Sequence, residues 1–212
     1  MTRKSSIKLV IFDFDGCIAN VEKAVKEGSH ELILKYVKTN IDVEKVARNE
    51  GMAVMIKKSG ISYWRVPRMI RKFRKKIGET FSSATPYYGM PKLLSDLNKN
   101  YTVGITTSNS KSNVDKFLKK FKLTANFYFV KTNISLFTKA WWLRILIKKH
   151  GFKRNETVMI GDEIRDIEAA HKVGAKSIAV TWGLNTKKLL KQSNPDHIVD
   201  KPSDILKIIN QM

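Results

Sequence analysis

IKLVIFDFDG, residues 7–16, begins as an apolar run and ends in two aspartates and a glycine. The run predicts a buried strand over Ile7–Phe14, because strand-length apolar segments fill the interior of a sheet. Side chains of an extended chain alternate between two faces, so Asp13 and Asp15 are expected on the same side of the strand end. Two neighbouring carboxylates repel each other and need a compensating positive charge. Gly16 allows the tight turn that must follow.

Apolar runs and helical periods alternate along most of the remaining chain. Further strands are expected at Thr102–Thr107, Phe127–Val130, Thr157–Ile160 and Ser177–Thr181. Between them, the spacing of apolar residues predicts a helix that begins after Ser110 or Ser112, and helices over Lys139–His150 and Ile164–Val173. Strands that alternate with helices of this length indicate an α/β fold with a parallel sheet covered on both faces.

The segment between the first two strands breaks this alternation. Residues 21–84 contain no convincing strand, and helical periods run over Val25–Val37, Val43–Lys57 and Tyr63–Phe81. We therefore expect a small all-helical domain inserted after the first strand. The predicted domains are 1–20 together with 86–212 for the α/β core, and 21–85 for the helical insertion.

The chain of 212 residues carries 40 Lys and Arg against 19 Asp and Glu, a net charge of +21. This excess favours an anionic partner, whether nucleic acid, a membrane surface or a phosphorylated small molecule. The hydrophobic share of 42% excludes a disordered chain, and no apolar stretch is long enough to span a membrane. Cys17 is the single cysteine and forms no internal disulfide. Asp13 interrupts the apolar run near the N-terminus and no small-residue cleavage site follows, so we expect a cytoplasmic protein.

A second acidic group, Gly161–Asp166 (GDEIRD), directly follows the strand expected before it. Asp162 lies at the strand end, and Asp166 lies one helical turn further on the same face. The carboxyl ends of parallel strands meet at one edge of the sheet, where such folds bind their ligands. Together with Asp13 and Asp15, this group predicts a site for a divalent cation with oxygen ligands, as Mg²⁺ prefers.

These motifs resemble those of the haloacid dehalogenase-like (HAD) phosphohydrolases over essentially the whole chain. Their order is DxDG at 13–16, a strand followed by Thr107, then Lys139, and GDxxxD at 161–166. The helical insertion resembles the cap that these enzymes carry after the first motif. Within the family, the phosphoglycolate phosphatase-like subgroup is the most similar, on residues 104–110 (GITTSNS), 161–170 (GDEIRDIEAA) and 180–183 (VTWG).

The resemblance implies a Rossmann-like core, a Mg²⁺ cofactor and a role for each matching residue. Asp13 is the expected nucleophile, and Asp15 is the expected general acid and base. The expected phosphate-binding residues are Thr107, Ser108, Asn109 and Lys139. The expected Mg²⁺ ligands are the Asp13 carboxylate, the backbone carbonyl of Asp15 and Asp162, with Glu163 or Asp166 acting through water.

The implied activity is Mg²⁺-dependent hydrolysis of a small phosphorylated metabolite, phosphoglycolate by default, through an aspartyl-phosphate intermediate. One alternative is a sugar-phosphate mutase, which uses the same nucleophile and returns the phosphoryl group. Another is a protein whose basic surface binds a polyanion, although nucleic acid is not an expected partner because no nucleic-acid-binding module is present. Arg65, Arg68 and Arg71 are candidate contacts for a substrate carboxylate, but a solvated helix face explains most of them better. Monomer and dimer both remain open.

Overall fold

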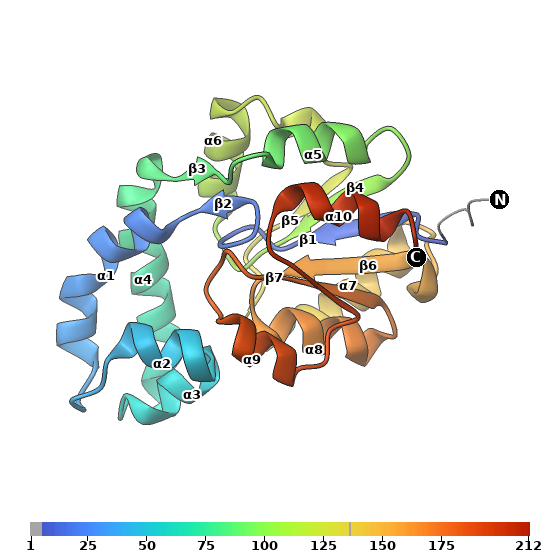
Figure 1. Ribbon diagram of the computed structural model, residues 1–212. Coiled ribbons are helices and arrows are strands. Elements are labelled where there is room, and N and C mark those ends of the chain that lie inside the picture. The colour runs from blue at the N-terminus through green and yellow to red at the C-terminus, as the bar shows by residue number, and fades with distance from the viewer. Residues whose placement is uncertain (1–5, 136) are drawn as a thin grey trace.

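Six parallel strands form the central sheet of the protein, whose computed structural model describes residues 6–135 and 137–212 (Figure 1). In sheet order they are β5 (Phe129–Lys131), β4 (Thr102–Thr106), β1 (Leu9–Phe12), β6 (Thr157–Gly161), β7 (Lys176–Val180) and β8 (His197–Val199). β1 lies in the interior of the sheet, with Leu9 opposite Thr102 of β4 and Thr157 of β6. The predicted α/β class with a parallel sheet is confirmed.

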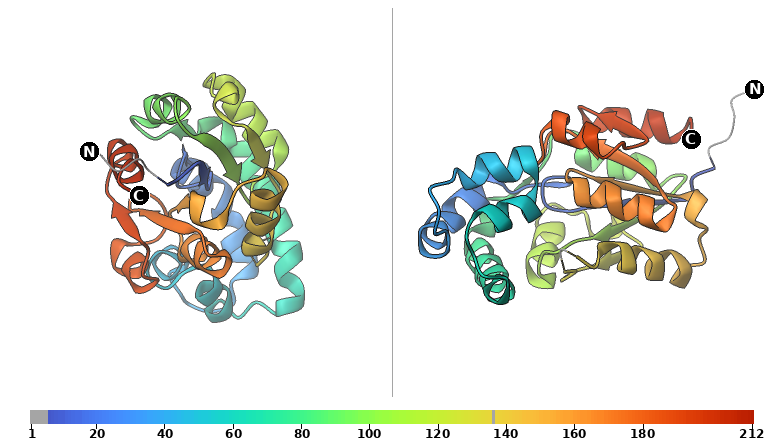
Figure 2. Two further views of the ribbon diagram at one scale, coloured as in Figure 1. Left: turned by 90° about the vertical axis from the view of Figure 1, so that its right-hand side faces the viewer. Right: turned by 90° about the horizontal axis from the view of Figure 1, so that it is seen from below.

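Alternate residues of β1 pack into two different layers of the core. Leu9 and Ile11 contact one layer, formed with α7 (Lys139–Lys149) and α8 (Ile164–Val173). Val10 and Phe12 contact the other, which is covered by α5 (Met90–Leu97), α6 (Lys111–Lys120) and α10 (Pro202–Ile209). α9 (Lys187–Gln192) packs beside α8, and helices therefore cover both faces of the sheet (Figure 2). No helix within the described parts of the chain is long and apolar enough to cross a membrane.

The first strand is shorter than its apolar run predicted. β1 ends at Phe12, and the chain then turns, because Phe14 O accepts hydrogen bonds from the backbone N–H groups of Ile18 and Ala19 at 3.0 and 2.9 Å. Asp13 and Asp15 therefore lie in this turn and not in the strand. The alternation of side chains that holds within a strand does not extend to them.

The segment 21–84 is helical apart from its connections. It forms α1 (Glu22–Tyr36), α2 (Val43–Glu50), α3 (Met52–Lys58) and α4 (Val66–Thr80), with single 3₁₀ turns at Tyr63–Arg65 and Phe81–Ser83 (Figure 1). The single helix expected over Val43–Lys57 is divided by Gly51, whose φ of 88° cannot continue a helix. These helices share an apolar cluster of their own, Ala47, Met55, Ile56, Ile61, Val66 and Met69. The domain boundaries 1–20, 21–85 and 86–212 remain a prediction.

The helical segment joins the sheet through a two-stranded ribbon and a group of aromatic rings. β2 (Ala19–Asn20) pairs antiparallel with β3 (Thr85–Pro86), where the chain leaves and re-enters the α/β region. The Phe117 ring of α6 lies 5.1 Å from that of Phe14, edge to face, and 6.3 Å from that of Phe81 at the end of the helical segment. Phe117 thus packs the helical segment against the turn that carries the first aspartates.

Replacing Phe117 with alanine tests this packing. Phe117 is 3% exposed, so Phe117→Ala removes a buried ring and leaves a cavity. We expect a loss of about 3–5 kcal/mol in the free energy of unfolding and a fall in Tm of roughly 6–20 °C. Calorimetry or circular dichroism measures the change. Phe137→Ala is the matched control, because Phe137 is 77% exposed; equal Tm values for the two variants would contradict the packing role.

Candidate active site

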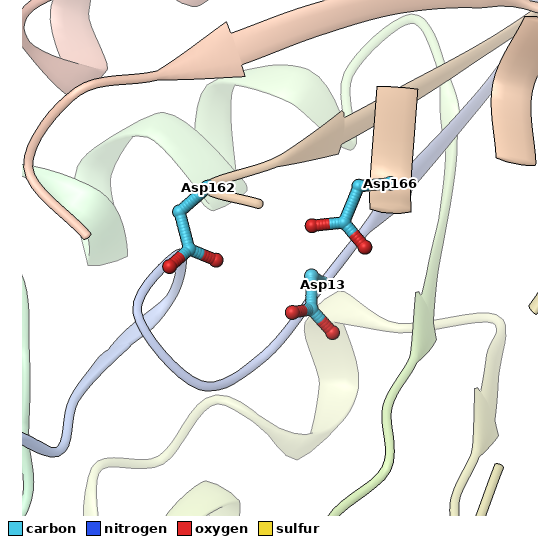
Figure 3. Close-up of side chains that lie close together, drawn as sticks. All are labelled: Asp13, Asp162 and Asp166. Carbon is cyan, nitrogen blue, oxygen red and sulfur yellow. The ribbon is translucent and has the colours of Figure 1, made fainter. Parts of the chain in front are cut away.

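Three aspartate side chains converge at the carboxyl ends of the central strands (Figure 3). Asp13 directly follows β1, Asp162 directly follows β6, and Asp166 lies in the first turn of α8. One carboxylate oxygen from each lies within 4.8 Å of the other two, and all three side chains are buried. The structure thus brings together three of the four aspartates that the sequence singled out.

Backbone hydrogen bonds and two closely packed glycines hold these carboxylates in place. Leu184 N donates a hydrogen bond to Asp162 Oδ2 at 2.7 Å, and Glu163 N donates to Asp166 Oδ2 at 3.1 Å. Asp162 also packs between two glycines. A Cβ atom at Gly16 would lie 2.2 Å from Asp162 Oδ2, and one at Gly183 would lie 2.3 Å from it. Only glycine at these two positions leaves room for the Asp162 carboxylate.

Lys139 is the cation at the centre of the cluster. Its ammonium group lies 2.9 Å from Asp13 Oδ1 and 2.5 Å from Asp166 Oδ1, and the side chain is 4% exposed. Burial alone would lower the pKa of Lys139, but the carboxylates of Asp13 and Asp166 outweigh it and hold the pKa above its usual value. The ammonium therefore stays charged between its two partners.

One lysine does not balance three carboxylates. Asp13 Oδ2 and Asp162 Oδ1 are buried and accept no hydrogen bond from any residue that the structure describes. Burial raises the pKa of Asp13 to about 6, and burial with the nearby negative charge of Glu163 raises that of Asp162 well above its usual value. Buried, unpartnered carboxylate oxygens at this spacing fit a hard divalent cation, which takes oxygen ligands. The donor set is suited to Mg²⁺.

Asp15 lies apart from the three clustered carboxylates and faces the loop after β4. Its Oδ1 accepts a hydrogen bond from Asn109 Nδ2 at 2.7 Å. Burial, together with the negative charge of Asp13, raises the pKa of Asp15 to about 7. Asn109 N in turn donates to Thr107 Oγ1 at 3.0 Å. The expected phosphate-binding residues Thr107 and Asn109 are thus adjacent to the expected acid and base, and Ser108 is half-buried between them.

Glu163 lies near the carboxylate cluster but pairs with an arginine. Its Oε1 accepts a hydrogen bond from Arg165 Nη2, which forms an ion pair at the start of α8. The negative charges of Glu163, Asp166 and Asp13 raise the pKa of Arg165 above its usual value despite its burial. The part of Glu163 as an indirect Mg²⁺ ligand remains a prediction, as do the roles of the other expected site residues.

The segment 183–186 contributes more to the site than the sequence indicated. Besides Gly183 and the N–H group of Leu184, it supplies Asn185, which is 1% exposed. Asn185 N donates to Asp162 O at 3.2 Å, and Asn185 Oδ1 accepts from Ile164 N at 2.9 Å. Gly183 acts through its lack of a side chain, Leu184 through its backbone N–H, and Asn185 through its backbone and its amide side chain. None of these residue types by itself indicates an active site. Only the resemblance at 180–183 pointed to this region.

Comparison with known proteins agrees with this geometry. A family model described as haloacid dehalogenase-like hydrolase matches residues 10–180, most of the chain. The chain belongs to the haloacid dehalogenase-like hydrolase family. The predicted family, fold class and hydrolase class are confirmed by this match.

Several HAD proteins resemble the chain over its whole length. A phosphoglycolate phosphatase of Synechococcus elongatus is 28% identical, over 97% of this chain and 99% of the relative. Pyrophosphatase PpaX of Bacillus mycoides is 27% identical, over 97% and 98%. The crystal structure of a predicted phosphatase from Clostridium acetobutylicum has a TM-score of 0.82 at 21% identity, over 97% and 99%. The likeness to this crystal structure shows that the two proteins share a fold.

The packing around Asp162 gives a direct test of the cation site. Gly183→Ala keeps every carboxylate but displaces Asp162, so we expect affinity for Mg²⁺ to fall by about 10–100-fold. Isothermal titration calorimetry measures the affinity, and the rise in Tm on adding Mg²⁺ gives a second readout. Thr181→Ala is the control, because the Thr181 hydroxyl bonds Asp200 at the surface and does not contact Asp162. Unchanged Mg²⁺ affinity in Gly183→Ala would contradict the proposed packing.

Proposed function

We propose that the protein is a Mg²⁺-dependent phosphatase that hydrolyses a small phosphomonoester through an aspartyl-phosphate intermediate. The observation that carries this proposal is the buried cluster of Asp13, Asp162 and Asp166 around Lys139, in which Asp13 Oδ2 accepts no hydrogen bond from the residues that the structure describes. A buried carboxylate oxygen without a hydrogen bond is available as a nucleophile. Membership of a hydrolase family supports the same reaction class.

In the first proposed step, Asp13 Oδ2 attacks phosphorus and the bond to the leaving oxygen breaks. Asp15 donates a proton to that leaving oxygen, which departs as an alcohol. The hydrogen bond from Asn109 Nδ2 fixes the Asp15 carboxyl, so its second oxygen is free to face the substrate. Covalent catalysis divides one difficult displacement into two easier ones.

In the second proposed step, water attacks the aspartyl-phosphate and Asp15, now ionised, accepts the proton of that water. Phosphate leaves and the Asp13 carboxylate is restored, so the atoms and the proton balance over the two steps. Lys139 stabilises the negative charge on the transferring group from its fixed position beside Asp13. The Thr107 hydroxyl, which accepts from Asn109 N, has its own proton free to donate to a phosphoryl oxygen.

A bound Mg²⁺ would be held by Asp13 and Asp162, with Asp166 beside them, and would neutralise charge between the anionic nucleophile and the phosphate dianion. Such a site could use Asp162 Oδ1, which accepts no hydrogen bond from any residue that the structure describes, and the Asp13 carboxylate through the oxygen that does not attack phosphorus. The identity of the cation rests on the oxygen-only donor set.

The proposed substrate is a small phosphorylated metabolite similar to phosphoglycolate. Relatives named phosphoglycolate phosphatase and pyrophosphatase, each matching nearly the full chain, support a small phosphate compound. Measuring inorganic phosphate against isomerised product separates this proposal from a sugar-phosphate mutase. A cytoplasmic location remains a prediction.

The nucleophile is tested by Asp13→Asn. This change removes the attacking oxygen's charge while keeping the size of the side chain, so we expect phosphate release from 2-phosphoglycolate or an aryl phosphate to fall at least about 1,000-fold. A colorimetric phosphate assay at saturating Mg²⁺ measures the rate. Asp115→Asn serves as the matched control, because Asp115 pairs with Lys111 on the exposed side of α6. A rate for Asp13→Asn near that of the wild type would rule out Asp13 as the nucleophile.

Removing divalent cations tests the metal requirement. We expect EDTA treatment to reduce phosphate release to the background rate and added Mg²⁺ to restore it, because two anions must otherwise approach each other without compensation. The Tm of the treated protein should fall as well, since a ligand that binds only the folded state stabilises it. Full activity in the presence of excess EDTA would contradict the Mg²⁺ dependence.

A further inference from the structure

A cleft of about 540 Å³ opens between α4 of the helical segment and the start of α6. One wall of the cleft is formed by α4 and is mostly basic. The other wall is formed by polar residues at the start of α6. The lining residues used below are Arg71, Arg74, Lys75 and Gly78 from α4, and Ser110 and Asn113 from the start of α6.

The cleft leads to the proposed acid and base. Asn113 Nδ2 donates to Asn109 Oδ1 at 2.9 Å, and Asn109 Nδ2 donates to Asp15 Oδ1 at 2.7 Å. The wall of the cleft at Asn113 is therefore two hydrogen bonds from the carboxyl that would protonate the leaving oxygen. Arg74, on the opposite wall, is also near enough to Asp15 for the charge of that carboxylate to raise the pKa of the guanidinium. The cleft therefore lies beside the carboxyl that would protonate the leaving oxygen.

The cleft is positively charged. Arg71, Arg74 and Lys75 line it against a single carboxylate, that of Glu79, and Glu79 lies 3.4 Å from Lys76. Within the described parts of the chain, none of the three lining cations forms an ion pair. Three cations without acidic partners in one cleft favour an anionic occupant.

Arg74 is the best placed of the three cations. It is half-buried, and its Nη2 donates to Ile134 O at 3.2 Å, while Ile134 N donates to Thr107 O at 3.0 Å. This connection fixes the guanidinium relative to the loop that would bind the transferring phosphate. Burial and the nearby Arg165 charge lower the pKa of Arg74, and Asp15 partly offsets them; an arginine remains protonated in any case. Its other N–H groups donate to no residue that the structure describes, so they can bind a ligand.

We propose that Arg74, with Arg71 and Lys75 beside it, binds a second anionic group of the substrate, carried on the leaving-group side. The preferred substrates are then small phosphate compounds whose leaving group bears a carboxylate or a further phosphate. This inference rests on the proposed phosphatase function and adds to it the residue that selects the substrate. Arginine suits both anions, because its planar fork can form two parallel hydrogen bonds with either.

The test compares three substrates with wild-type protein and Arg74→Gln at saturating Mg²⁺. 2-Phosphoglycolate carries a carboxylate on its leaving group, pyrophosphate carries a phosphate, and ethyl phosphate carries no charge there. We expect Arg74→Gln to lower kcat/KM about 10–100-fold for the anionic substrate that the wild type prefers, mainly through KM, because a charge-assisted hydrogen bond is lost. With ethyl phosphate, kcat/KM should change by less than about threefold.

Arg144→Gln is the matched control. Arg144 is exposed on α7 and does not line the cleft, so the same chemical change there should alter none of the three rates. A preference of the wild type for phosphoglycolate identifies the second anion as a carboxylate, and a preference for pyrophosphate identifies it as a phosphate. Either preference, lost in Arg74→Gln, supports the inference.

Two results overturn the inference while the proposed function stands. One is a wild-type protein that hydrolyses ethyl phosphate as efficiently as both anionic substrates. The other is an Arg74→Gln variant whose kcat/KM falls equally for all three, since a purely structural role would produce that pattern. A wild-type protein that releases phosphate from none of the three overturns the proposed function, and the inference falls with it.

Discussion

The burial of three carboxylates around one ammonium group is the constraint on which the rest of the structure depends. Removing an ion from water costs several kcal/mol even after the protein relaxes, and the mutual repulsion of Asp13, Asp162 and Asp166 adds to this. Lys139 offsets part of the cost through its contacts with Asp13 and Asp166. The backbone N–H groups of Leu184 and Glu163 offset a further part, and under the proposed function a bound cation would offset the rest. Clusters of buried, mutually repelling carboxylates are typical of functional sites.

The loop that holds Asp162 also links the helical segment to the site. Asn185 accepts from Ile164 N beside the cluster, and its Nδ2 donates to Ala47 O in α2 at 3.0 Å. The next residue, Thr186, donates from its backbone N–H to Arg48 O at 2.9 Å. The loop that positions Asp162 therefore also holds α2. Any motion of the helices away from the sheet has to break these hydrogen bonds, and so acts directly on the loop beside the cation site.

The sequence predicted those features that depend on periodicity and on motif order. Strand-length apolar runs placed five of the six sheet strands, and the motif order placed Asp13, Lys139 and Asp162 at one edge. The two-residue strands β2 and β3 were missed because segments so short show no period. Strand β8 was missed because it contains only two consecutive apolar residues, whereas the equally short β5 lies in the apolar run 127–130. Arg74 was missed for another reason. Six of the 15 residues of α4 are basic, and only the way this helix faces α6 decides which of them line the cleft.

The net charge of +21 is compatible with this site but does not explain its selectivity. Many of the lysines form exposed ion pairs, as Lys92 does with Asp96, and such pairs contribute about 0–1 kcal/mol each. Their summed field attracts any anion and is screened over about 10 Å at ordinary ionic strength. Selection between anions requires a cation held at a fixed distance from the reacting phosphate. Arg74 is anchored through Ile134 to the loop of Thr107, so under the proposed function it would supply such a cation, whereas an exposed lysine would not.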